Sequence, residues 1–418
     1  MSIGEILYEL TEAKEPFEVL NVWTNYNHIL KDYKLIINIE KYNNIFPPNL
    51  LNSTEAEDTD LISYFPTGNL IFVDNENIEQ MILNDTVDIK WDYSIMLDTN
   101  YTSYIEKFIN NEMDFHLESV YKTLDILLQE DFNYDYTFYL IENYANIFES
   151  GSKMYSIKNA GHIALYKNLF SLEKFKSIDS AEYKKNKNFI YQLEESEAHL
   201  KTSTLITNLL GNENSLESIL ESHKAMTLFL IGVWKIQFDS KASAKNKIKK
   251  LMDFVTQKVG IYFEREFMIA YKYFEKNNSI SMLNKINKGG KHNGLLDKIE
   301  NIAWDFMIPR IMEIHMANGK SNYFIPFILS HDKKLKELLK QFEVKGFLYH
   351  KNNFEFYPIS LINTTEFFEE KGLLDEIMEF GKLQTQKERR KTMERNRKEG
   401  FKNIENELKS LESILKSS

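Results

Sequence analysis

Three aspartates, Asp98, Asp305 and Asp332, are the residues of this sequence best suited to chemistry. Asp98 follows the apolar run 95–97, which is typical of a strand buried on both faces. Asp332 follows a second such run, 323–329. Because ligands of α/β folds bind beyond the carboxyl ends of strands, we expect both aspartates at a cleft. Asp305 lies on a predicted helix between apolar residues.

Each aspartate also has an ordinary structural explanation. Asp98, Thr99 and Asn100 form a common turn sequence after a strand. Asp332 precedes a predicted helix and could be its N-cap. Asp305 could pair with a basic residue. Burying even one unpaired carboxylate costs several kcal/mol, so three that converge would predict a cation between them.

A glutamate near an apolar helix face is the fourth candidate. Glu266 borders the face formed by Phe263 and Phe267, in a helix predicted over about 240–274. Its neighbour Glu264 is an alternative. Arg265 lies between the two glutamates and could orient or neutralise either of them. The sequence around this helix therefore leaves the choice of glutamate open.

The predicted ligands are hard oxygen atoms, which select Mg²⁺ or Mn²⁺. The chain has no cysteine, which excludes disulfides, thiolate zinc sites and cysteine nucleophiles. Divalent ions at carboxylate clusters usually serve phosphoryl chemistry, in which one ion activates a water molecule and a second stabilises the leaving oxygen. Thr99 or Asn100 could then hold the phosphate or a metal-bound water.

The order of these residues resembles the PIN and PIN-like nuclease superfamily. The most specific element is Leu97-Asp-Thr-Asn100, and the segment 329–335 is similar to the family's terminal strand, acid and helix. The resemblance covers about residues 91–345. It implies a three-layer α/β/α domain with a parallel sheet and a metal-dependent phosphodiesterase, most often a ribonuclease.

Carried over by position, the resemblance assigns the catalytic and metal-binding acids to Asp98, Glu266, Asp305 and Asp332. The family's glutamate usually lies nearer to the first aspartate, so Glu142 competes with Glu266 for that role. The positions expected to contact the substrate or support the acids are Thr99, Asn100, Glu142, Arg265 and Ser330. The sequence is also similar to divergent members among bacterial toxins and phage-defence effectors, which implies an endoribonuclease with one of these roles.

The pattern of apolar residues predicts an α/β fold with three consecutive regions. A small α+β module is expected over residues 1–90, and the PIN-like nuclease core over 91–345 with a large helical insertion at about 110–250. Residues 346–418 are expected to end in a basic and amphipathic helix. The basic part of that tail is either a solvated helix face or a contact to nucleic acid.

The net charge of −11 argues against a protein that coats nucleic acid by bulk charge, although a local basic surface is compatible with it. No signal-peptide pattern and no apolar run of roughly 20 residues is present, so we expect a cytoplasmic protein without a membrane partner. RNA is the favoured partner. The alternatives are a DNA nuclease with the same site, and a non-catalytic helical scaffold that binds a partner protein. A regulatory protein and a second copy of the chain, paired through the C-terminal helix, are further candidate partners.

Overall fold

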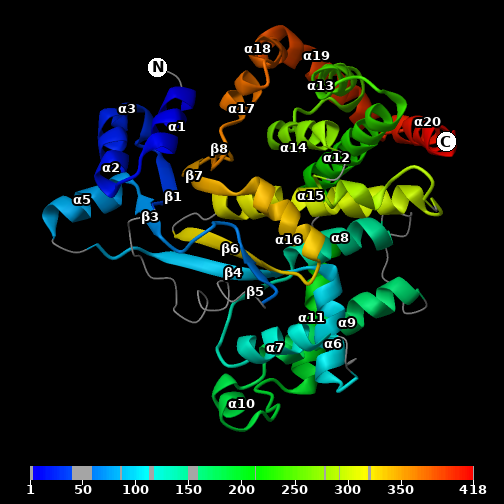
Figure 1. The fold of residues 1–418 in the computed structure, drawn as a ribbon. Coiled ribbons are helices and arrows are strands. Elements are labelled where there is room, and N and C mark those ends of the chain that lie inside the picture. The colour runs from blue at the N-terminus through cyan, green and yellow to red at the C-terminus, as the bar shows by residue number, and fades with distance from the viewer. Residues whose placement is uncertain are drawn as a thin grey trace. The chain divides into compact units, whose positions relative to one another are not determined.

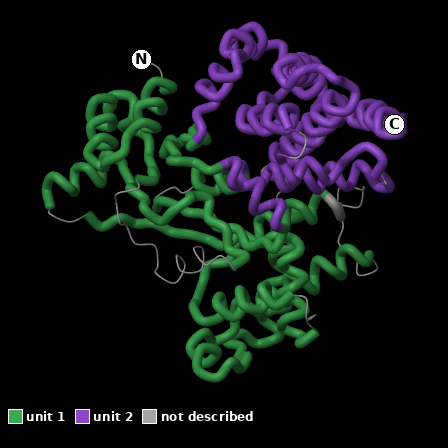
Figure 2. Tube along the Cα trace, viewed as in Figure 1, with its two compact units in different colours: residues 1–214, 311–332, 343–361 green, residues 215–310, 333–342, 362–418 purple. Residues whose placement is uncertain are grey.

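The chain forms two compact units in the computed structural model (Figure 2). Unit 1 contains residues 1–214, 311–332 and 343–361, and unit 2 contains residues 215–310, 333–342 and 362–418. The structure describes residues 3–39, 59–84, 87–112, 117–148, 159–211, 213–276, 279–290, 292–318 and 322–417. Every strand among the described residues belongs to unit 1.

The helices and strands of unit 1 come from three separate stretches of the chain (Figure 1). The helices are α1 (Ile3–Glu12), α2 (Pro16–Asn25), α3 (Asn27–Leu30), α5 (Asn75–Leu83), α6 (Thr99–Ile109), α7 (Glu118–Leu127), α8 (Thr137–Phe148), α9 (Ala160–Lys176), α10 (Ser180–Asn186) and α11 (Glu195–Gly211). The strands are β1 (Tyr33–Asn38), β2 (Leu61–Ser63), β3 (Leu70–Val73), β4 (Trp91–Leu97), β5 (Tyr134–Asp135), β6 (Tyr323–Leu329), β7 (Val344–His350) and β8 (Phe356–Ser360).

Helices are the regular secondary structure of the described residues of unit 2. Its helices are α12 (Glu213–Asp239), α13 (Ala244–Phe254), the π-helix η2 (Val255–Val259), α14 (Glu264–Glu275), η3 (Leu283–Lys285), most of α15 (Leu295–Ala317), α16 (Lys333–Leu339), η4 (Lys340–Phe342), α17 (Thr364–Glu370), α18 (Leu374–Gly381), α19 (Leu383–Lys398) and α20 (Asn403–Lys416). The continuous helix predicted over about 240–274 is wrong. Gly260 adopts a φ of +88°, a left-handed conformation that ends helices, and α14 begins only at Glu264.

The first sheet has the strand order β3-β1-β7-β8 and is antiparallel. Its strand β1 is buried along its whole length, and its side chains pack with Ile6 and Leu10 of α1 and with Val19 and Trp23 of α2. The N-terminal α+β module is therefore completed by β7 and β8 from much later in the chain. The pairing between β1 and β7 joins residues more than 300 positions apart, which no local pattern reveals.

The second sheet has the order β2-β6-β4-β5, and it holds the two strands that end in aspartates. Strands β4 and β6 are parallel neighbours, with Leu97 opposite Leu329, and β5 is parallel to β4 on its other side. Pro326 lies opposite Ser94 within this pairing. The edge strand β2 ends at Ser63 opposite Phe327, so β2 does not pair with Pro326, whose nitrogen has no hydrogen to donate.

The predicted α/β character and a parallel strand pairing are confirmed, whereas the three-layer PIN-like arrangement stays a prediction. The expected helical insertion corresponds to α7 through α13, interrupted by the short strand β5. The division at about residues 90 and 345 also stays a prediction, since the two compact units are each built from separate stretches of chain. None of the helices in the described stretches is long and apolar enough to cross a membrane.

Candidate active site at the carboxyl ends of β4 and β6

The parallel pairing of β4 with β6 brings Asp98 and the segment from Ser330 to Asp332 to one edge of the sheet (Figure 1). The backbone amide of Asp98 donates to the carbonyl of Leu329 at 3.1 Å, so the ladder continues one step beyond the strands. The hydroxyl of Ser330 donates to Oδ2 of Asp98 at 2.7 Å. Asp98, Ser330 and Asp332, which the sequence predicted separately, therefore lie together within unit 1.

Asp98 is a buried carboxylate, with only 9% of its surface exposed. Burial raises its pKa above the ordinary value, and the negative charge of Asp332 raises it further. The hydrogen bond from Ser330 acts in the opposite direction because it stabilises the ionised form. Asp332 is half-buried, and its backbone amide donates to the Ser330 hydroxyl at 3.2 Å. Ser330 thus contacts both aspartates.

Glu142 is the glutamate that the structure places beside Asp98. It lies on α8, and the Thr99 hydroxyl donates a short hydrogen bond to its Oε2. Burial raises the pKa of Glu142 to about 7, and the charge of Asp98 contributes to the shift. Asp98, Glu142 and Asp332 therefore form a chain of carboxylates, in which each charge hinders the ionisation of the next.

A buried aspartate that the sequence did not single out lies beside these acids. Asp60 is 3% exposed and contacts Nδ1 of His331 at 3.0 Å. It also accepts a hydrogen bond from the hydroxyl of Tyr101 at 3.1 Å. The ring of Tyr104 meets that of His331 edge to face. Asp60 reaches this position because β2 pairs antiparallel with β6, a contact that the acidic sequence around Asp60 does not signal.

Glu266 and Asp305 belong to unit 2 and have basic partners there. Glu266 is fully buried, and Arg310 donates to both of its oxygens, at 2.7 Å to Oε1 and 2.6 Å to Oε2. Asp305 pairs with Lys285 at 3.6 Å. Arg265, which the sequence analysis expected to contact the substrate or support the acids, is buried, and its guanidinium lies over the ring of Phe342.

These pairings give Glu266 and Asp305 a structural explanation, and the alternative Glu264 is hydrogen-bonded to Thr364. Burial raises the pKa of Glu264, and the positive charge of Arg265 partly opposes that shift. A buried carboxylate with a two-pronged arginine partner needs no cation to neutralise it. To bind a metal ion as expected, Glu266 would therefore have to give up its ion pair with Arg310.

The chemistry of the donor set in unit 1 fits a hard divalent cation, because Asp98, Glu142 and Asp332 offer only oxygen ligands, and the charge of Asp332 disfavours ionisation of Asp98 as that of Asp98 disfavours ionisation of Glu142. Across the stretches that the structure describes, no group of three or more His, Asp or Glu side chains is placed to hold a metal ion. The metal site itself stays a prediction.

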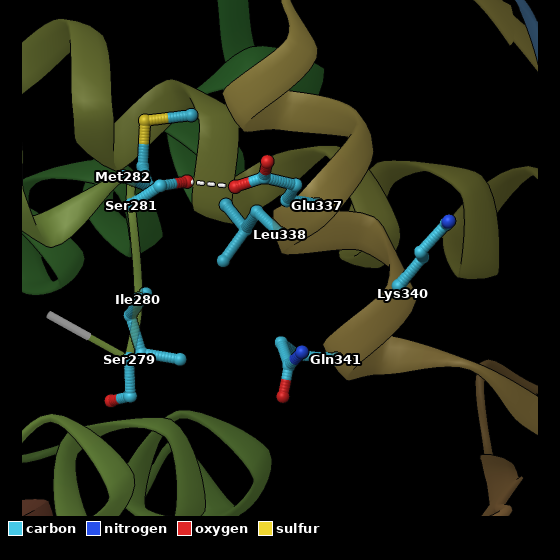
Figure 3. Close-up of a pocket in the computed structure, with 8 residues that line it drawn as sticks. All are labelled: Ser279, Ile280, Ser281, Met282, Glu337, Leu338, Lys340 and Gln341. Atoms are coloured by element: carbon cyan, nitrogen blue, oxygen red, sulfur yellow. Dashed lines mark hydrogen bonds between the residues drawn. The ribbon is translucent and has the colours of Figure 1, made fainter. Parts of the chain in front are cut away.

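A separate hollow in unit 2 has a volume of about 230 Å³ (Figure 3). Its walls come from the loop before η3 and from α16 and η4, and the hydroxyl of Ser281 donates to the carboxylate of Glu337 inside it. The hollow is smaller than a typical ligand pocket of roughly 300 to 1,000 Å³. None of the predicted site residues lines it.

Comparison with known proteins adds no assignment. No family model matches the chain, and neither a curated protein nor a solved structure matches it.

Proposed function

We propose that the protein is a metal-dependent nuclease whose catalytic acids are Asp98, Glu142 and Asp332, with RNA as the favoured substrate. The observation that carries this proposal is the position of Asp98 and Asp332 at the carboxyl edge of two parallel strands, with Glu142 hydrogen-bonded to Thr99 beside Asp98; the charge of Asp332 raises the pKa of Asp98, and that of Asp98 raises the pKa of Glu142. A cation bound among these carboxylates would relieve the repulsion between their charges.

The protein's own side chains would orient these acids. Ser330 donates to one oxygen of Asp98, which also accepts hydrogen bonds from the backbone of Thr99 and Asn100, and the Thr99 hydroxyl donates to one oxygen of Glu142. These residues would hold Mg²⁺ or Mn²⁺. Such an ion would lower the pKa of a bound water molecule, so that a hydroxide able to attack a phosphodiester is available at neutral pH. Glu142 replaces Glu266 in this proposal because it lies beside Asp98 and within the same unit. A toxin or anti-phage role rests on the resemblance alone.

The proposal is tested by incubating the purified full chain with labelled single-stranded RNA, structured RNA and DNA in Mn²⁺, Mg²⁺ or EDTA. We expect metal-dependent cleavage that Asp98→Asn abolishes and Asp88→Asn retains, since Asp88 is an exposed loop residue. Cleavage of DNA alone would replace RNA as the substrate. Equal cleavage by Asp98→Asn would remove the proposed site.

A non-catalytic scaffold is the second candidate. It is favoured by the basic partners of Glu266 and Asp305, and by the finding that no group of three or more acids or histidines in the described stretches is placed to hold a metal ion. Absence of cleavage, together with absence of Mn²⁺ binding in calorimetry, would replace the nuclease with this scaffold.

A further inference from the structure

Helix α19 of unit 2 is fastened along one face to the π-helix η2. The hydroxyl of Thr392 donates to the carbonyl of Thr256 at 2.8 Å. The guanidinium of Arg395 donates to the carbonyl of Gln257 at 2.7 Å, and the amide of Asn396 donates to the next two carbonyls along η2. These side chains satisfy carbonyls near the end of η2 that its own backbone leaves open. These hydrogen bonds therefore fix the rotation of α19 about its own axis, with this inner face toward η2.

Gly260 lets η2 approach α19 closely, and Arg389 on the same face of α19 packs against α18. A Cβ at Gly260 would lie 2.6 Å from the backbone nitrogen of Met393, so only glycine allows the backbones of Gly260 and α19 to lie this close together. Arg389 is buried, lies 4.2 Å above the centroid of the Phe380 ring and donates to the Phe380 carbonyl at 2.6 Å. The arginine on this face thus serves packing and is not available to a partner.

The outer face of α19 carries four exposed cations: Lys387, Arg390, Lys391 and Lys398. At 100° per residue they fall within about 100° of one another, roughly opposite the fastened face. None of the four forms an ion pair within the described stretches of chain, and Glu394 is the acid that shares their sector. By contrast, the guanidinium of Arg397, at the margin of this sector, pairs with Glu221 at 2.7 Å.

We propose that this outer face of α19 binds the phosphate backbone of a nucleic acid. The four cations span about 16 Å along the helix axis, at a rise of 1.5 Å per residue. Phosphates in a single strand repeat at a few ångströms, so the array faces several of them. Fastening to η2 holds the cations in place before binding, which reduces the entropy lost on association.

The partner is a nucleic acid and not a membrane because the inner face of α19 is occupied. A basic amphipathic helix binds lipid by burying its other face in the bilayer. Here that face is packed against η2 and Gly260. The overall charge of −11 also makes a nonspecific attraction to any polyanion weak outside such a local surface.

The test is binding of a fluorescent single-stranded RNA, followed by anisotropy between 50 and roughly 300 mM salt. All proteins carry Asp98→Asn so that the probe stays intact. The test variant replaces Lys387, Arg390, Lys391 and Lys398 by Gln. The control variant replaces four exposed lysines of unit 1 by Gln and so loses the same charge: Lys31, Lys167, Lys185 and Lys201.

We expect the test variant to bind about tenfold more weakly or worse at 100 mM salt, and its salt slope to fall by up to about 3, since each phosphate contact contributes about 0.7. The control variant should keep the slope of the parent. Equal losses in both variants, or binding of anionic lipid vesicles in preference to RNA, would overturn the proposal.

This inference gives the proposed nuclease its substrate-holding surface and in that sense rests on the proposed function, but the two fail separately. If the α19 variant with Asp98 restored loses RNA binding but still cleaves a short dinucleotide, the catalytic roles proposed for Asp98, Glu142 and Asp332 are retained. RNA binding by a protein that never cleaves would leave the surface of α19 in place.

Discussion

The raised pKa of Glu142 makes the stability of the protein depend on pH. Its pKa is about 7 in the folded state and near 4.5 in the unfolded chain. The folded state therefore binds this proton more tightly, and the stability that the proton contributes is fully present below pH 4.5 and is lost as pH rises through 7. We predict that Glu142→Gln is more stable than the wild type at pH 8, by at most about 3 kcal/mol, and equally stable at pH 4.5.

Thermal unfolding of both proteins across this pH range, without divalent ions, measures the effect. Addition of Mn²⁺ at pH 8 should narrow the difference, because a bound cation relieves the repulsion between Glu142 and Asp98 in the wild type only. A difference that does not change with pH would show that Glu142 ionises normally in the folded protein.

Ser330 is predicted to stabilise the ionised form of Asp98. Ser330→Ala removes the hydroxyl that donates to Asp98 at 2.7 Å, which should destabilise the protein by about 1.5 to 3 kcal/mol at neutral pH and weaken Mn²⁺ binding. Ser94→Ala is the matched control, since its buried hydroxyl has no hydrogen-bond partner among the described residues. Urea unfolding and calorimetry compare the two. Equal effects would mean that the Ser330 hydroxyl has no special relation to Asp98.

The aspartates at the strand ends are the part of the site that sequence alone can predict. Asp98 and Asp332 each follow a continuous apolar run, and such runs indicate buried parallel strands whose carboxyl ends meet. Asp60 carries no comparable signal, because its contact with His331 depends on an antiparallel pairing between segments about 270 residues apart. Glu142 was one of three glutamates, and only the fold separates it from Glu266.

At the scale of elements, the contact between η2 and α19 is predicted to tolerate no side chain at Gly260. Gly260→Ala places a Cβ 2.6 Å from Met393 and forces a left-handed conformation on alanine, so we expect a loss of roughly 1 to 3 kcal/mol. Gly381→Ala, at the end of α18 with open space around it, should be neutral. Thermal unfolding distinguishes the two variants. A neutral Gly260→Ala would show that α19 is loosely attached.

Sequence patterns predict the elements with apolar periodicity well and their interruptions poorly. The strand that ends at Leu97 and the helix after Asp332 follow directly from composition and spacing. The break at Gly260 does not, because one glycine within a helical pattern can either continue a helix at some cost or end it. Its effect here depends on α19, which lies about 130 residues later and fills the space beside it.

At the scale of the whole molecule, the pairing of Glu266 with Arg310 is predicted to stabilise unit 2. Arg310→Met leaves the fully buried Glu266 without its partner, which should cost about 3 kcal/mol or more. The double variant with Glu266→Gln should recover most of the loss, since the buried charge is then absent. Calorimetric unfolding measures both. No recovery in the double variant would mean that the arginine acts through packing on Phe263 instead.

The organisation into two units could not be predicted from the sequence, because both units are built from three stretches of chain. Sheet pairings that join β1 to β7 and β4 to β6 span more than 200 residues, and nothing in a local window indicates them. The periodicity of apolar residues did predict an α/β protein with a long helical region, since those features depend on local sequence pattern alone.

The most direct test of the central claim compares Glu142→Gln with Glu266→Gln in Mn²⁺-dependent cleavage of one labelled RNA. The site at the β4–β6 edge predicts that Glu142→Gln loses roughly 100-fold or more of the cleavage rate, while folded Glu266→Gln stays within a few-fold of the wild type. The opposite result, with activity lost in Glu266→Gln and kept in Glu142→Gln, would contradict the account and move the catalytic glutamate to unit 2.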